Sequence, residues 1–145
     1  MDTPISFLLI DGHSIVFAWD DLRELHDQRP SMAREELIRR LTAYQDATGE
    51  RVVLVFDGQS GNPEDTREPG GIQIFYSKTG GSADAVIERL AEKYGKAYRL
   101  TVASRDRAVL EACSASGALC IGPPSLREQL DAADQRFRDE WKRRR

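Results

Sequence analysis

Residues 5–10 read ISFLLI, and Asp11 and Gly12 follow them directly. A stretch of this length that is apolar at every position except Ser6 is typical of a strand that is buried on both faces of a parallel sheet. Residues 51–56, which read RVVLVF, have the same character and are also followed by an aspartate and a glycine, Asp57 and Gly58. The two stretches therefore predict two buried strands, each with an acid at its carboxyl end.

The rest of the chain alternates between strand and helix patterns. Further strands are predicted at 72–76, 99–103 and 118–121, and helices at 34–48, after Ser82, after Ser104 and from Ser125, which forms a capping box with Glu128. Gly49 and Gly117 are placed to end two of the helices, and residues 58–71 are predicted to be a loop. This order predicts a single α/β domain over residues 1–145, with a mostly parallel five-stranded sheet and helices on both of its faces.

Bulk composition sets broad limits on function. The chain has 145 residues, of which 40% are hydrophobic and 31% charged, and its formal net charge is -3, so it has no general excess of basic residues for nucleic acid. Its two cysteines lack the paired spacing of a zinc site and are expected to be reduced thiols. No stretch approaches the roughly 20 apolar residues of a membrane span, and no signal peptide is evident. We therefore expect a cytoplasmic protein.

The most informative residues are four aspartates near strand ends. Asp11 and Asp57 follow their strands directly, Asp106 follows the strand at 99–103, and Asp84 lies in the first turn of the helix after the strand at 72–76. Ligands of open parallel sheets bind beyond the carboxyl ends of the strands. Carboxylates gathered there repel one another unless a cation is bound, and oxygen ligands favour Mg²⁺ or Mn²⁺. The pattern predicts metal-assisted hydrolysis of phosphodiester bonds.

Each aspartate also has a purely structural explanation. Asp11 follows a strand and could cap the next turn, while Asp57 with Gly58 is a common hairpin turn. Asp84 and Asp106 lie at helix N-termini, where the helix dipole favours acids. The catalytic interpretation therefore depends on all four side chains meeting at one edge of the sheet.

Residues beside these acids could support catalysis or RNA binding. Ser104 could hydrogen-bond near the metal, although capping a helix would also explain it. Lys78 and Arg105 are positioned to hold phosphates. His13 is expected to fill the loop after the first strand, and Phe17, Trp19 and Tyr76 are better explained by core packing than by stacking on bases.

Four segments carry a resemblance to a known family: DGHSIVFAW, VVLVFD, SADAVIERL and ASRD. Through them the chain resembles the YacP-like branch of the NYN-domain family, which is PIN-like and related to flap nucleases. The resemblance runs from Ile5 to about Leu130. It implies a three-layer α/β/α sandwich, and metal-binding acids that correspond to Asp11, Asp57, Asp84 and Asp106. It also implies a ribonuclease that uses magnesium or manganese and acts on single-stranded RNA, with mRNA at the ribosome as one expected substrate.

The opening motif departs from the family pattern. The family commonly reads DGYN, whereas this chain reads Asp11-Gly12-His13-Ser14, so Ser14 stands where an asparagine could position the first aspartate or a metal-bound water. A serine hydroxyl both donates and accepts hydrogen bonds, so Ser14 is expected to support the site.

The chief alternative is a catalytically weak PIN-like module that binds RNA or protein, an interpretation that the change at Ser14 keeps open. A phosphatase of the haloacid-dehalogenase type would need an aspartate at the position of His13. A P-loop is excluded because GxxxxGK[ST] is absent, and the chain has no glycine-rich turn for a dinucleotide after the first strand.

Overall fold

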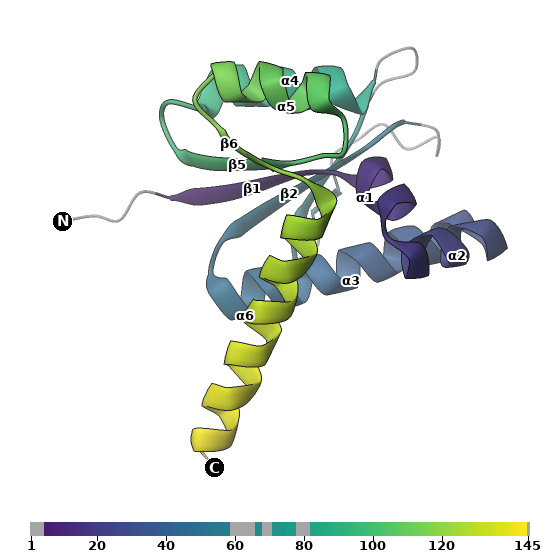
Figure 1. Ribbon diagram of the computed structural model, residues 1–145, viewed down its shortest axis with the longest axis vertical. Coiled ribbons are helices and arrows are strands. Elements are labelled where there is room, and N and C mark those ends of the chain that lie inside the picture. The colour runs from purple at the N-terminus through teal and green to yellow at the C-terminus, as the bar shows by residue number, and fades with distance from the viewer. Residues whose placement is uncertain (1–4, 59–65, 68–70, 78–81, 145) are drawn as a thin grey trace.

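The computed structural model of the chain describes residues 5–58, 66–67, 71–77 and 82–144, which fold around one sheet (Figure 1). Within these residues the sheet has six strands in the order β3-β4-β2-β1-β5-β6. The strands are β1 (Ser6–Asp11), β2 (Arg51–Phe56), β3 (Thr66–Arg67), β4 (Gln73–Tyr76), β5 (Arg99–Ala103) and β6 (Leu119–Ile121). All neighbouring pairs are parallel except β3 with β4, so the carboxyl ends of five strands lie along one edge.

Helices cover both faces of the sheet. They are α1 (Gly12–Ala18), α2 (Asp20–Gln28), α3 (Pro30–Thr48), α4 (Ala83–Tyr94), α5 (Arg107–Ala115) and α6 (Pro123–Arg143). Helices α4 and α5 lie on one face, and α1, α2, α3 and α6 lie on the other (Figure 1). No helix in the described part of the chain combines the length and the apolar character that a membrane crossing needs.

The alternation of side chains along the buried strands produces a core on each face. Leu8 and Ile10 of β1 belong to one hydrophobic cluster, together with Leu37 of α3 and Leu126 of α6. Leu9, between them in the sequence, belongs to the other cluster, which includes residues of α4 and α5. From Leu8 to Ile10 the strand is buried on both faces, which explains why the sequence is apolar without interruption there, while Ser6 at its start is only half-buried.

The predicted α/β class and the mostly parallel five-stranded arrangement are confirmed, and β2 and β5 have the predicted bounds. The sixth strand, β3, lies inside the segment 58–71 that was predicted as a loop, so that prediction was wrong at Thr66–Arg67. Helices α1 and α2 were not predicted, and α3 begins at Pro30 instead of residue 34. Charged residues dominate α2, so its only fully buried position, Leu22, gives a weak periodic signal.

Two predicted helix starts were also wrong. Asp106, and not Ser104, caps α5, because its side chain accepts the N–H of Ala108. Helix α6 begins at Pro123 after Gly122, so Ser125 lies inside the helix and not at its cap. Proline is favoured at the first helical position because its fixed φ suits the helix and its missing N–H costs nothing there. The predicted cap at Ser82 is confirmed.

Candidate active site at the carboxyl edge of the sheet

The structure brings the four predicted aspartates to one edge of the sheet. Asp11 ends β1, Asp57 follows β2, Asp84 is the second residue of α4, and Asp106 precedes α5. The charges of Asp57 and Asp84 both act on Asp11, and those of Asp57 and Asp106 act on Asp84. We call these four residues the acidic edge.

Burial and repulsion both disfavour negative charge at the acidic edge. Asp11 is only 6% exposed, and its pKa is raised to about 6, chiefly by burial, with smaller contributions from the charges of Asp84 and Asp57. Hydrogen bonds from Ser104 and Ser14 act in the opposite direction on this pKa. The pKa of Asp84 is also raised, first by burial and then by the nearby carboxylates, including Glu88 one turn later.

Three of the four aspartates also hold helix N-termini, which the structural explanations predicted for Asp11 and Asp106 but not for Asp57. Asp11 Oδ1 accepts the N–H of Ser14 at 3.4 Å, and Asp106 Oδ1 accepts that of Ala108 at 2.9 Å. Asp57 Oδ1 accepts the N–H of Ala83, the first residue of α4, at 2.7 Å. These bonds fix the orientation of each carboxylate, so capping and ligand binding are compatible. The carboxyl group of Asp84 instead lies near that of Asp106, which contributes to the raised pKa of Asp84.

Two serines connect the acidic edge to the backbone. Ser104 Oγ donates to Asp11 Oδ2 at 3.0 Å and accepts the N–H of Asp106 at 3.0 Å. Ser14 Oγ accepts the N–H of Arg105 at 2.5 Å and lies 3.4 Å from Ser104 Oγ. Since Ser104 has one hydroxyl proton and gives it to Asp11, Ser14 must be the donor between the two serines. The pair thus forms a directed chain of hydrogen bonds that ends on Asp11.

His13 packs beside Asp57 as a neutral side chain. Its Nδ1 accepts the N–H of Asp57 at 3.3 Å, which requires that nitrogen to be unprotonated. Burial is the main reason why the pKa of His13 lies below its ordinary value. The distance of 3.4 Å from Nδ1 to Asp57 Oδ2 is therefore a contact and not an ion pair. The imidazole also meets the edge of the Phe56 ring, with centroids 5.4 Å apart, in agreement with a packing role.

Two glycines let the backbone reach this edge. A Cβ atom on Gly12 would collide with the ring of Phe56, and one on Gly58 would collide with the carbonyl oxygen of Ser77. Gly58 N–H donates to Ser77 Oγ at 2.9 Å, so the segments that leave β2 and β4 stay in contact beyond the sheet. The glycines after Asp11 and Asp57 therefore serve close packing, and neither has a positive φ.

The donor set fits a hard divalent cation by its chemistry. All four groups are carboxylates, and no lysine or arginine side chain in the described residues forms an ion pair with them. The pKa values of Asp11 and Asp84 are raised first by burial and then by the neighbouring carboxylates, and a cation would relieve that repulsion. Within the described ranges, however, no three His, Cys, Asp or Glu side chains form a ready-made metal cage.

The other predicted residues have different outcomes. Lys78 lies outside the described residues. Arg105 is exposed, and its guanidinium lies 5.8 Å from the centroid of the Phe17 ring. Trp19 is buried in the core as predicted, with its indole N–H donated to Pro123 O at 3.1 Å. Sequence reasoning missed His26, whose imidazole meets Phe17 at 4.7 Å between centroids, because nothing in the sequence connects α2 to this edge.

A parallel sheet with helices on both faces and acids at its carboxyl edge is the architecture of a PIN-like domain, the class that the resemblance implied. The chain belongs to the YacP-like NYN domain family, whose sequence profile it matches over residues 8–145. This family is generally nuclease-like.

Individual relatives agree with that assignment. The uncharacterized protein YacP of Bacillus subtilis (strain 168) is 28% identical over 135 residues, which cover 92% of this chain and 79% of that protein. The crystal structure of Rae1 (YacP) from Bacillus subtilis matches with a TM-score of 0.79 and 28% identity, over 99% of this chain and 81% of that one. A tryptophan-to-leucine mutant of Rae1 gives a TM-score of 0.76 and 30% identity, over 90% and 77%.

Proposed function

We propose that this protein is a metal-dependent ribonuclease that hydrolyses RNA phosphodiester bonds at the acidic edge. The observation that carries the proposal is the convergence of Asp11, Asp57, Asp84 and Asp106, which interact electrostatically while no described lysine or arginine pairs with them. Uncompensated carboxylates are costly to a fold, so an arrangement that concentrates them at one edge favours a bound cation.

The four aspartates would hold Mg²⁺ or Mn²⁺, and such an ion supplies Lewis-acid stabilisation of phosphate and an activated water. The protein's own groups prepare the site. Ser104 and Ser14 orient Asp11, and Asp57 fixes the start of α4 and with it the backbone of Asp84. Arg105, and Lys78 as a further prediction from the sequence, would bind phosphates of the RNA.

The substrate in this proposal is single-stranded RNA. Nuclease-type relatives favour RNA, and mRNA at the ribosome is the specific substrate that the family resemblance implies. A cytoplasmic location is part of the proposal because ribosomes and mRNA are found there. Ribosomes therefore belong in the functional assay as a second condition.

A cleavage assay tests the proposal. Purified protein is incubated with end-labelled single-stranded RNA in Mn²⁺, in Mg²⁺ and in EDTA, with and without ribosomes. We expect cleavage that needs the metal and that Asp11→Asn and Asp84→Asn each abolish. Asp46→Asn is the matched control, because Asp46 is an exposed aspartate on α3, outside the acidic edge.

The alternative function is an RNA-binding or protein-binding module without efficient catalysis. It is supported by the absence of a ready-made metal cage in the described ranges and by the helix-capping roles of three aspartates. RNA binding that is unaffected by EDTA, with no cleavage under any of the conditions above, would favour this alternative.

A further inference from the structure

Arg105 lies between two residues of the site, yet it does not neutralise the acidic edge. It follows Ser104 and precedes Asp106, and its backbone N–H is bound by Ser14 Oγ. A guanidinium so close to several carboxylates would normally form an ion pair. Among the residues that the structure describes, Arg105 has no such pair, and its guanidinium instead lies over Phe17 of α1.

Phe17 belongs to a row of aromatic side chains that starts at the acidic edge. His13, in contact with Asp57, stacks on Phe17 with ring centroids 6.1 Å apart and an interplanar angle of 20°. His26 of α2 meets Phe17 at 4.7 Å and 66°. Phe17 and His26 are partly exposed, and Arg105 is exposed. We call Phe17, His26 and Arg105 the aromatic–arginine surface.

The position of the guanidinium separates positive from negative charge at the site. The carboxylates remain available to a cation, while the Arg105 donors remain available to an anion on the α1 side. Proteins that hold single-stranded nucleic acid combine a cationic group for the backbone with flat side chains for the bases, and the arginine plane can itself stack. The aromatic–arginine surface provides both in one place.

We propose that the aromatic–arginine surface is a nucleotide subsite that directs the RNA strand from the acidic edge across α1. Arg105 binds the phosphate of a nucleotide next to the one that is cleaved, and the base of that nucleotide packs on the Phe17–Arg105 pair. Because a paired base cannot leave its stack without cost, this subsite selects single-stranded RNA. The inference rests on the proposed function in taking RNA as the ligand and the acidic edge as the place of cleavage.

Binding measurements in EDTA test the subsite separately from catalysis. The probes are a short fluorescein-labelled oligoadenylate and a series in which one abasic nucleotide occupies successive positions. We expect the wild-type protein to lose about tenfold in affinity at one abasic position, the effect of one stacked base. Phe17→Ala should bind the intact probe about tenfold more weakly and lose its sensitivity to that abasic position.

Arg105→Lys separates stacking from charge, because lysine keeps the positive charge but lacks the planar group. We expect this variant to keep the salt dependence of binding and to lose most of the abasic sensitivity. Arg105→Ala should lose both, with the slope of log affinity against log salt reduced by about 0.7 for one phosphate contact.

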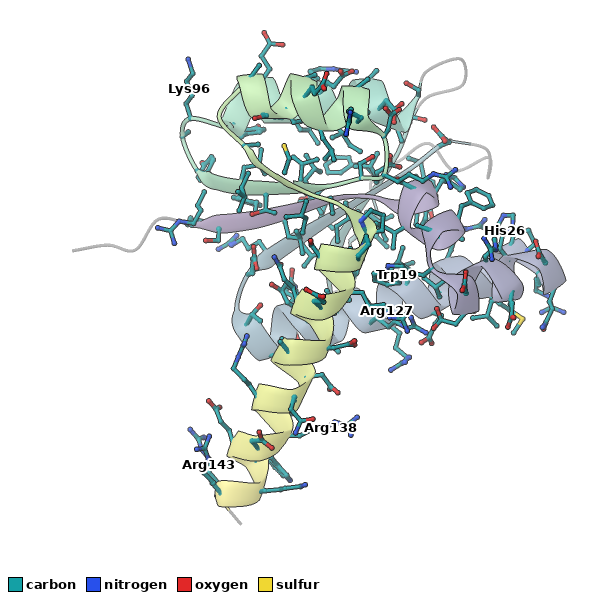
Figure 2. All side chains as sticks on the ribbon, viewed as in Figure 1. Trp19, His26, Lys96, Arg127, Arg138 and Arg143 are labelled. Atoms are coloured by element: carbon teal, nitrogen blue, oxygen red, sulfur yellow. The ribbon has the colours of Figure 1, made fainter. Side chains whose placement is uncertain are left out.

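Tyr94→Ala is the matched control. Tyr94 ends α4 and also has a cation over its ring, Lys93 Nζ at 5.3 Å. Lys96, two residues later, lies on the opposite side of the molecule from His26 in the view of Figure 2. We expect Tyr94→Ala to bind every probe as the wild type does.

Two results with the Phe17→Ala variant would overturn the inference. One is that Phe17→Ala binds intact and abasic probes as the wild type does. The other is that it weakens all probes equally, which indicates a general structural defect. Cleavage by a wild-type protein that shows no position-specific abasic effect would also reject the subsite while leaving the nuclease intact. Position-specific binding without cleavage in Mn²⁺ would support the subsite and reject the nuclease.

Discussion

The acidic edge and the contact between α2, α3 and α6 both contain closely spaced acids, but their surroundings differ. In the second region, Asp21 Oδ2 accepts from Arg40 Nη2 at 2.6 Å, and Asp21 Oδ1 accepts from Arg127 Nη1 at 2.9 Å. Glu36 Oε2 accepts from Arg40 Nε at 2.8 Å. We call Asp21, Glu36, Arg40 and Arg127 the arginine cluster. Figure 2 shows Arg127 beside Trp19, where α6 meets the other two helices.

The pKa values of the two regions move in opposite directions. Hydrogen bonds from Arg127 and Arg40 hold the pKa of Asp21 well below its ordinary value, and Arg39 and Arg40 lower that of Glu36 to about 2. At the acidic edge, burial and neighbouring carboxylates raise the pKa of Asp11 and Asp84. The same residue type therefore stabilises the fold where arginine meets it and stays available for a ligand where arginine does not.

The largest expected difference between the regions is in catalysis. Asp84→Asn should lower the rate of metal-dependent RNA cleavage at least about hundredfold, because it removes a charged ligand of the proposed ion. Asp21→Asn should leave the rate within about twofold, since the hydrogen bonds of Asp21 go to Arg40, Arg127 and the N–H of Leu22, and none goes to the acidic edge. Initial rates on one labelled RNA measure both. Equal losses in the two variants would remove the functional distinction between the regions.

A smaller loss of cleavage activity is expected when the uncharged hydrogen-bond donor to Asp11 is removed. Ser104→Ala deletes the donor to Asp11 and the acceptor of the Asp106 N–H. We expect cleavage to fall about tenfold, as for other residues that orient a ligand, and the free energy of unfolding to fall by about 1 kcal/mol. Ser116→Ala, in the turn after α5, serves as the control. An unchanged cleavage rate in Ser104→Ala would show that Asp11 needs no orientation.

The arginine cluster should account for part of the acid sensitivity of the fold. The folded pKa of Glu36, about 2, lies below its ordinary value of 4.5, so its contribution to stability is present above pH 4.5 and is lost as the pH falls toward 2. The contribution is about 1 kcal/mol, because one of its arginine partners is largely exposed. Urea unfolding at a series of pH values should show a shallower acid limb for Glu36→Gln. If stability falls as steeply with pH in this variant as in the wild type, other groups cause the loss of stability in acid.

The smallest predicted effect has the opposite sign. Without metal, Asp84→Asn should raise the free energy of unfolding by a few tenths of a kcal/mol, because it removes repulsion within the acidic edge. Asp21→Asn should lower it by about 1 kcal/mol, because two arginines lose a charged partner. Urea unfolding in EDTA measures both. Destabilisation by Asp84→Asn would mean that favourable contacts of the Asp84 carboxylate outweigh its repulsion by the other acids.

Local patterns in the sequence were enough to predict the sheet and the position of the acids. The short, mostly apolar stretches at 5–10 and 51–56 are typical of buried strands, and parallel strands bring Asp11 and Asp57 to the same edge. Asp84 and Asp106 followed because helices that start after parallel strands begin at that edge. Their roles as metal ligands stay predictions.

Contacts between distant segments could not be predicted. Asp21 and Arg127 meet although they lie 106 residues apart, and no local pattern encodes that pairing. Ser104 and Asp106 are both good capping residues, and in the structure Ser104 donates to the distant Asp11 while Asp106 caps α5. The contact of Phe17 with Arg105 and His26 depends on the packing of α1, a short helix that the sequence analysis did not identify.

The central position of β1 has a consequence for synthesis of the chain. Although β1 is made first, it pairs with β5 on one side, so its hydrogen-bonding edge stays open until Ala103 has been made. An apolar strand with an open edge is prone to aggregate, and the nascent chain carries this risk over most of its length. Because Ser104 follows β5 directly, the pairing that closes this edge also carries Ser104 to Asp11. Protection of the nascent strand and the placement of Ser104 against Asp11 are therefore one event.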